Sequence, residues 1–344
     1  MFGKILASLN IGGTIVDTIL EKKELRQGEK VGGQLRLVGG KSEQKINNAT
    51  LTLVCEYRYD HKKSVKHTWK QVKIGPIGTI RPQEEKVIPF QLEVPETMPC
   101  TFHDYLREGF CTNLITDLDI PFAINPHDND EVTILPHRDL QLLLDILESL
   151  GMKVVKMSGP MVPFGSTAPA FPYYQSISLE SGGLVSATVS LLWKGNGEIK
   201  CFLGRNSRML NISASDHEEG GERMKALFEK ELGVAERKLV NEVLERLGID
   251  RDPARFYRLR IPERYRPYCT EFSLEYLHKN LFELELDQKR KGLKSMVDDM
   301  LDLDERKIRF RVNEEDLRDR GKRIEALIID SFEQLKPNGT EKNT

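Results

Sequence analysis

A regular alternation of apolar and polar residues between Thr14 and Tyr59 is the feature that most restricts how this chain folds. Successive side chains of a β-strand point to opposite faces, so an alternating run places one apolar face against a core. Turn-forming residues separate the runs at 27–29 and 39–41, where glycine tolerates a positive φ. The stretch predicts strand, turn, strand, loop, strand, which is typical of a β-sandwich. The alternating apolar positions are Val31, Gly33, Leu35 and Leu37, then Leu51, Leu53, Cys55 and Tyr57.

The same rhythm continues to residue 137. A polar hairpin tip at 60–64 precedes a strand at 65–74, and alternation returns at 88–94. Pro89 interrupts that run and has no backbone N–H to donate, which places its strand at a sheet edge or at a bulge. Turn signals recur about every 8–12 residues, as in an all-β sandwich. We therefore predict a sandwich domain over residues 1–137.

The most polar segment of this part joins two predicted strands between Thr112 and His137. It contains His127, Asp128 and Asp130. Their spacing fits neither a calcium loop nor a two-histidine zinc helix. Asx side chains that cap a turn explain the same residues. A small-ligand or catalytic site near the 125–131 loop stays open as the alternative.

Helical spacing replaces alternation at Arg138. A leucine-rich helix ends at Gly151, and strands follow at 174–179, 185–193 and 199–203. A second helical region runs from 221 to 247 and is broken near Gly233. The predicted fold is mainly β with α+β: a first α+β unit at 138–220, a second at 221–335, and a disordered tail at 336–344 without apolar residues.

The two α+β units contain an internal repeat. Leu-Glu-Ser-Leu-Gly at 147–151 resembles Leu-Glu-Arg-Leu-Gly at 244–248, and Ser-Leu-Glu at 178–180 recurs at 273–275. In the second unit a strand with Glu283, Glu285 and Asp287 on one face precedes a strand with Arg309 and Arg311. Opposite charges on neighbouring strands stabilise a sheet, so we predict that these two strands pair.

Composition places the chain in a narrow class. With 51 Lys and Arg against 53 Asp and Glu, the net charge of -2 creates no global field to attract nucleic acid. The five cysteines form no CxxC pair, which favours a reducing compartment. The apolar run at 5–9 is too short for a signal peptide, and no run reaches the roughly 20 residues that span a bilayer. We expect a cytoplasmic protein in which residues 2–9 pack on the sandwich, with weak peripheral membrane contact as the minor alternative.

Motifs that carry chemistry are missing from the sequence. It contains no GxxxxGKS, GxGxxG, GxSxG or HExxH pattern, and the seven histidines are scattered. No local signature of a cysteine nucleophile surrounds any cysteine. We therefore expect neither an enzyme nor a bound cofactor or metal.

Several stretches resemble the sporulation-control proteins of bacteria. They are FGKILAS at 2–8, VDT at 16–18, GEKVGG at 28–33, GGKSEQKI at 39–46 and DIPFAINPHD at 119–128. The resemblance covers residues 1 to about 215, and 281–312 is similar to the family's own C-terminal segment. It implies an arrestin-like fold and regulation of sporulation, or of stress and cell division, through protein–protein contact. The chain resembles a member whose second half is duplicated.

Two hypotheses of function follow. In the first, the protein is a regulatory adaptor whose sandwich binds a protein partner through an exposed strand edge. The predicted contact residues are His61, Lys62 and Lys63 at the hairpin tip and Pro89 on the edge strand. In the second, the protein binds a small ligand or catalyses a reaction near the 125–131 loop. A structural protein whose halves bind only each other is the third option.

Overall fold

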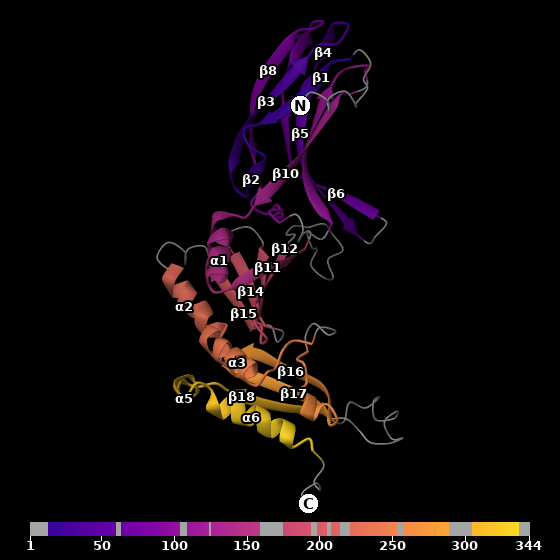
Figure 1. The fold of residues 1–344 in the computed structure, drawn as a ribbon. Helices are drawn as coiled ribbons and strands as arrows, with labels where there is room; N and C mark the ends of the chain where they lie inside the picture. Colours follow the sequence, from indigo (N-terminus) through magenta and orange to yellow (C-terminus); the bar gives the residue numbers. More distant parts are fainter. Residues whose placement is uncertain are drawn as a thin grey trace, which may run out of the picture.

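The computed structural model describes residues 13–59, 63–103, 109–123, 125–158, 175–193, 198–204, 208–213, 221–252, 258–278, 280–288 and 305–336. The molecule is elongated, with a β-sandwich at one end and helix-covered sheets at the other (Figure 1). Residues 1–12, which carry the predicted N-terminal contact, and the predicted tail from 337 lie outside the described residues.

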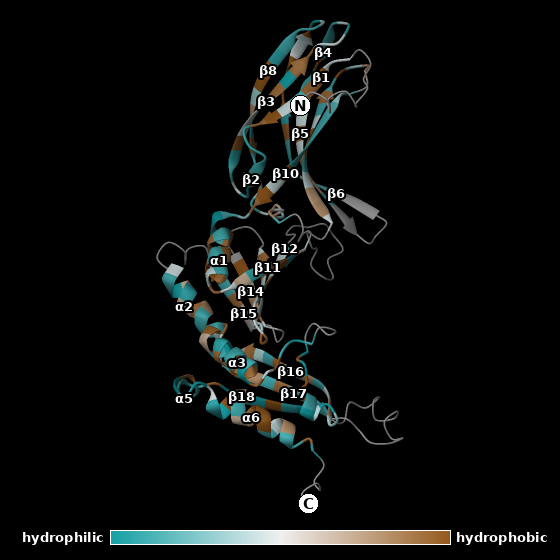
Figure 2. Ribbon diagram, in the orientation of Figure 1, coloured by the Kyte–Doolittle hydropathy of each residue, from teal (hydrophilic) through white to brown (hydrophobic). Residues whose placement is uncertain are grey.

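The smaller sheet of the sandwich has three antiparallel strands in the order β1-β3-β8. The predicted alternation of β3 is confirmed, because Val31, Leu35 and Leu37 are buried while Lys30 and Gln34 are exposed. Hydrophobic and hydrophilic residues alternate along the strands of the sandwich (Figure 2). The bounds of these strands are Ile15–Leu20 (β1), Lys30–Val38 (β3) and Glu85–Glu93 (β8).

The larger sheet has five strands in the order β2-β10-β9-β5-β6. β4 and β7 form a two-stranded ribbon, and β4 lies at the end of the sandwich farthest from the helices (Figure 1). β2 is parallel to β10, and the other pairs in these sheets are antiparallel. The bounds are Glu24–Arg26 (β2), Gln44–Ile46 (β4), Asn48–Tyr59 (β5), Lys63–Ile74 (β6), Gly78–Ile80 (β7), Phe110–Asp119 (β9) and His127–Leu135 (β10).

The two sheets enclose one hydrophobic core. Its central residues include Leu35, Leu51, Leu53, Leu92 and Ile134, all with no exposed surface. Burying each such side chain contributes about 1.5–3 kcal/mol, so this core is the main stabilising feature of the sandwich.

Glycine serves two different purposes in the predicted turns. Gly28 has a φ of +79° in the turn after β2, where Glu29 N donates to Arg26 O. Gly39, in the second turn segment, does not adopt a positive φ. A Cβ atom at Gly39 would lie 1.9 Å from Arg81 O, so glycine is required there for the close approach of two chain segments.

Two buried glutamine side chains join the sandwich to the first α+β unit. Gln175 Oε1 accepts from Cys100 N at 2.8 Å, and its Nε2 donates to Cys100 O at 2.8 Å and Ser158 O at 3.0 Å. Gln27 binds in the same manner, donating to Met98 O and accepting from His137 N. The side-chain amides of Gln27 and Gln175 thus supply hydrogen-bond partners to backbone groups of Met98, Cys100 and His137, which lie outside the regular strands.

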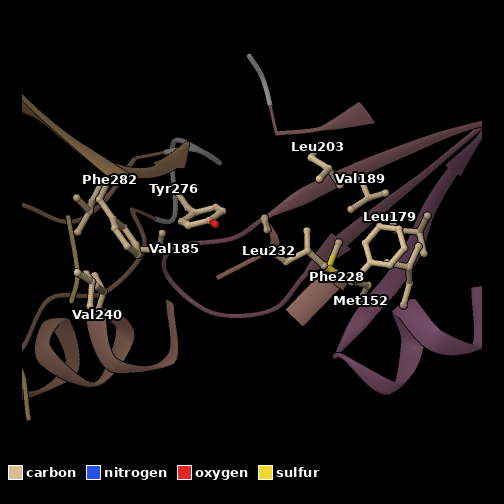
Figure 3. Close-up of a cluster of buried hydrophobic side chains, with 14 of the residues drawn as sticks. Met152, Leu179, Val185, Val189, Leu203, Phe228, Leu232, Val240, Tyr276 and Phe282 are labelled. Atoms are coloured by element: carbon tan, nitrogen blue, oxygen red, sulfur yellow. The ribbon is translucent and has the colours of Figure 1, made fainter. Parts of the chain in front are cut away.

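The first α+β unit packs helices against one antiparallel sheet of five strands in the order β11-β12-β13-β14-β15. The predicted helix stop at Gly151 is confirmed by its φ of +80°. β11 and β15 were not expected from the sequence. The bounds are Arg138–Ser149 (α1), Met152–Met157 (β11), Gln175–Ser181 (β12), Thr188–Trp193 (β13), Glu198–Leu203 (β14) and Arg208–Ser213 (β15). Gly221–Glu231 (α2) begins the predicted second unit but packs against this sheet, with Phe228 beside Met152 and Leu179 (Figure 3).

The second unit contains a three-stranded antiparallel sheet, β16-β17-β18. The predicted pairing of the acidic and basic strands is confirmed: Glu283 faces Arg309 with an Oε2–Nε distance of 2.6 Å, and Glu285 faces Lys307. The bounds are Val234–Arg246 (α3), Glu263–Tyr265 (η4, a 3-10 helix), Cys269–His278 (β16), Leu281–Gln288 (β17), Glu305–Arg311 (β18), Glu314–Arg318 (α5) and Lys322–Glu333 (α6).

One continuous core extends through both units. Leu232, directly after α2, lies between the side chains of the two units: the group around Phe228 is on one side and the group around Tyr276 on the other (Figure 3). Arg237 is only 4% exposed and donates to Leu232 O at 2.7 Å and to Ser181 Oγ at 2.6 Å. The units therefore pack as a single body. Their origin by duplication stays a prediction, since one sheet has five strands and the other three.

Candidate interaction surface on the sandwich

The predicted contact residues are only partly described. His61 and Lys62 lie outside the described residues, and Lys63 is placed as the first residue of β6. Pro89 lies in β8, opposite Gln34 of β3, with its side chain exposed. Since β8 is the last strand of its sheet, the prediction of an edge strand at Pro89 is confirmed.

The outer face of the three-stranded sheet exposes large apolar side chains. Ile15 and Ile19 of β1 are each 46% exposed, and Val87 of β8 is 52% exposed. The register places Ile19, Gln34 and Pro89 in one row across the sheet, and Asp17, Arg36 and Val87 in the next. We call this surface, defined by Ile15, Ile19, Val87 and Pro89, the outer sheet face.

A charged pair crosses the outer sheet face. Arg36 Nε donates to Glu85 Oε1 at 2.7 Å and its NH2 group donates to Glu85 Oε2 at 3.3 Å. The guanidinium lowers the pKa of the Glu85 carboxyl and the carboxylate raises the pKa of Arg36. The face therefore combines apolar anchors with a fixed ion pair, a composition common at protein interfaces.

The expectation of a loop at 125–131 is wrong for most of its length, because β10 begins at His127. Asp128 Oδ2 accepts from Thr18 N at 2.7 Å, and Asp130 Oδ1 lies 3.0 Å from Lys23 Nζ. Asp128 thus ties the larger sheet to β1, and Asp130 binds the segment between β1 and β2, so the two carboxylates do not converge on a cleft. Strand geometry explains the change, since β10 continues the ladder with β9 as far as His127.

These carboxylates also affect a third one. Partial burial, followed by repulsion from Asp128 and Asp130, raises the pKa of Asp17, and Arg36 opposes this shift. Among the described residues, no group of three or more His, Cys, Asp or Glu is arranged to hold a metal ion.

A turn at the tip of the β9–β10 hairpin was not recognised from the sequence. Ala123 N donates to Ile120 O at 3.3 Å, and Phe122 at the third turn position has a φ of +60°. This is the arrangement of a type II turn. Such a turn favours proline at its second position, where Pro121 stands, and glycine at its third position, which Phe122 occupies. Phenylalanine there costs about 1–2 kcal/mol in backbone strain. The sequence signal that could have indicated this turn is the apolar Phe122 directly after Pro121.

A cleft of about 280 Å³ lies between the sheets of the two α+β units. Its charged residues already bind one another: Arg258 NH2 lies 2.7 Å from Glu271 Oε2, and Arg258 NH1 lies 3.6 Å from Glu285 Oε2. Ser273 Oγ also donates to Glu285 Oε2 at 3.2 Å. Arg258, Glu271, Ser273 and Glu285 of the lining thus bind one another.

Four of the five cysteines are buried. Burial raises the pKa of Cys269 to about 11 and the pKa values of Cys100 and Cys201 well above the usual range of a thiol. A thiol becomes a nucleophile only as the thiolate, so these three behave as small apolar side chains.

The described part of the chain contains no helix with the length and hydrophobicity to cross a bilayer.

Known proteins resemble the chain in sequence and in fold. The sporulation-control protein Spo0M of Bacillus subtilis is 31% identical over 166 residues, which are 47% of this chain and 62% of that protein. The crystal structure of Spo0M from the same organism matches with a TM-score of 0.51 at 22% identity, covering 64% of this chain and 97% of the other. This match supports the arrestin-like fold that the resemblance implied.

The model of the Spo0M family, described as SpoOM protein, matches residues 2–191. This range includes the whole described sandwich and the first strands of the next unit. The chain therefore belongs to the Spo0M family.

Proposed function

We propose that this protein is a non-catalytic regulator that acts in sporulation control, or in related stress and division physiology, by binding a protein partner through its sandwich. Its family membership supports the regulatory role. We further propose a cytoplasmic location and no nucleic-acid partner, in keeping with the net charge of -2.

The observation that carries the proposal is the outer sheet face. Ile15, Ile19 and Val87 together leave apolar surface in water on a sheet whose opposite face is buried. Gln34 and Arg36 of β3 lie between the apolar residues of β1 and those of β8, so the face mixes apolar and polar groups, as non-obligate protein interfaces do. Pro89 and the charged residues of β8 oppose the addition of a further strand at this edge, so we propose contact across the face rather than β-strand pairing.

Affinity capture from the source organism tests the proposal. The full chain is compared with the double variant Ile19→Glu, Val87→Glu, which changes only exposed side chains. We expect a reproducible partner with the unmodified chain and its loss with the variant. Leu227→Glu, on an exposed position of α2, is the matched control and should retain the partner.

Recovery of no reproducible partner contradicts a role in protein binding. Equal recovery by the double variant and the unmodified chain contradicts the outer sheet face as the site.

A further inference from the structure

The turn at 120–123 presents one phenylalanine entirely to solvent. Phe122 has a relative exposure of 111%, the largest of the exposed large apolar residues in the described part of the chain. Its φ of +60° is a conformation that glycine adopts more easily. At this position the free protein therefore carries both backbone strain and an exposed aromatic ring, and replacing phenylalanine by glycine would relieve both.

The turn is held in place by neighbouring segments. Asp119 Oδ2 accepts from Asn47 Nδ2 at 3.2 Å and from Asn48 Nδ2 at 3.0 Å, and Asn47 N donates to Asp119 O at 2.9 Å. Asn125 Oδ1 accepts from Ile120 N at 3.2 Å. A ring on a fixed turn loses little conformational freedom when it is bound, which favours affinity.

The position of the turn makes it accessible. Asp119 pairs with Asn48 at the start of β5, next to β4. Figure 1 places β4 at the end of the sandwich farthest from the helices. The turn thus projects from one extremity of an elongated molecule.

The charge of the β9–β10 hairpin, which carries the turn, indicates what the turn binds. No Lys or Arg occurs between Arg107 and Arg138, whereas the β9–β10 hairpin carries five carboxylates. Asp117 and Asp119 flank the turn directly and are exposed. An anionic membrane surface would be repelled by these charges, while a protein pocket with a basic rim would be attracted. The five carboxylates are those of Asp117, Asp119, Asp128, Asp130 and Glu131.

We propose that Phe122 is the apolar anchor with which the tip of the sandwich enters an apolar, basic-rimmed pocket on a protein partner. This inference rests on the proposed function and adds a second contact, separate from the outer sheet face. Aromatic anchors in desolvated pockets commonly account for most of the affinity of an interface.

The stability of the free protein provides the first test. Because the left-handed turn position strains phenylalanine, Phe122→Gly should raise the melting temperature of the isolated chain by about 2 °C. Phe122→Ser should change it little, since the ring has no packing to lose. A fall of several degrees with both variants would show that the ring supports the fold, and would overturn the proposal.

The second test identifies the partner and measures affinity. A photo-reactive benzoylphenylalanine is placed at position 122 of the full chain in the source organism, with position 227 as the control. The protein cross-linked only from 122 is then purified. We expect Phe122→Ser to weaken its binding about 30-fold, Phe122→Leu to weaken it less, and Asp117→Lys to weaken it with a reduced dependence on salt.

Three outcomes would overturn the proposal. These are no specific cross-link from 122, an affinity unchanged by Phe122→Ser, and binding of a Phe122→Trp chain to vesicles of phosphatidylcholine and phosphatidylglycerol. A partner that survives Phe122→Ser but is lost with Ile19→Glu, Val87→Glu would leave the proposed function standing without this anchor.

Discussion

Individual side chains in this protein hold together segments that are far apart in the sequence. Thr18 N donates to Asp128 Oδ2, and Thr18 Oγ1 lies 2.7 Å from Thr116 Oγ1 inside the sandwich. These contacts connect the two sheets along the side where β1 passes β10. They also gather three carboxylates at one place, so electrostatic repulsion accompanies the link.

Asp17→Asn should therefore stabilise the sandwich near neutral pH. The pKa of Asp17 is raised in the folded protein, so its carboxylate destabilises the fold above that pKa and the penalty disappears as the pH falls through it. Because Asp17 is largely solvated, we expect a gain below about 1 kcal/mol at pH 7. Thermal melts from pH 7 to pH 3 should show the gain shrinking with falling pH. Glu24→Gln, at an exposed carboxyl of β2, should show no such trend, and a constant or growing gain would contradict the explanation.

Among the secondary-structure elements, α5 depends most on a single carboxylate. Asp316 Oδ2 accepts from Asn313 N while Asn313 Oδ1 accepts from Asp316 N, each at 2.9 Å, which forms a capping box. Arg323 of α6 donates to both oxygens of Asp316, at 2.7 and 2.6 Å, and also to Arg311 O at the end of β18. The buried Asp316 thus connects α5 with α6, and Arg323 extends the link to β18.

Asp316→Asn should destabilise the second unit by about 2 kcal/mol, because it breaks a buried, doubly bonded ion pair. Arg323 lowers the pKa of Asp316, so the stabilisation is complete above the unfolded pKa and is lost as the pH falls through the folded pKa. Urea unfolding at pH 7 and pH 3 measures both effects. The control is Glu314→Gln, which removes a fully exposed pair with Arg318 and should have almost no effect. Equal effects of the two substitutions would refute this role of Asp316.

Arg237→Met should destabilise the joint between α2 and α3 by about 2 kcal/mol, since Leu232 O and Ser181 Oγ lose a charged donor while buried. Lys238→Met, at the adjacent exposed position, serves as the control. Hydrogen exchange should locate the loss of protection in α2, α3 and the end of β12. A loss confined to one unit would argue against a shared core.

Sequence predicted the elements whose contacts are local and periodic. The alternation in β3 and the helix stop at Gly151 follow from spacing within one short segment, and the pairing of β17 with β18 follows from the opposite charges of two successive strands. Contacts over long separations were missed: Gln175 and Cys100 are 75 residues apart, and nothing in either neighbourhood indicates the other. Of the candidate surface, Pro89 was found from its missing N–H. Phe122 was not identified from the sequence, because the third position of a type II turn is expected to hold glycine.

At the scale of the whole molecule, the sandwich and the α+β body meet through a small polar junction. Trp193 is 2% exposed, donates from Nε1 to Glu96 O at 2.7 Å and stacks on His137 with a centroid distance of 5.4 Å. Gln175 and Gln27 complete the junction from either side. Because these hydrogen bonds are directional, the relative orientation of the two parts depends on them.

Gln175→Leu should weaken this junction. It leaves Cys100 N, Cys100 O and Ser158 O buried without their partner, which costs about 3 kcal/mol in local stability. Small-angle scattering should show a broader distribution of overall dimensions, and proteolysis should become faster at the connection. Gln71→Leu, on the exposed side of β6, is the control. Unchanged scattering with Gln175→Leu would mean that other contacts fix the orientation.

The placement of the two indole rings has a practical consequence for spectroscopy. The chain contains two tryptophans, Trp69 beside the sandwich core and Trp193 at the junction. Replacing Trp69 by phenylalanine leaves Trp193 as the one indole, and its emission wavelength depends on how far water reaches the junction. The emission of Trp193 then reports whether binding of the proposed partner at Phe122 changes the distant junction.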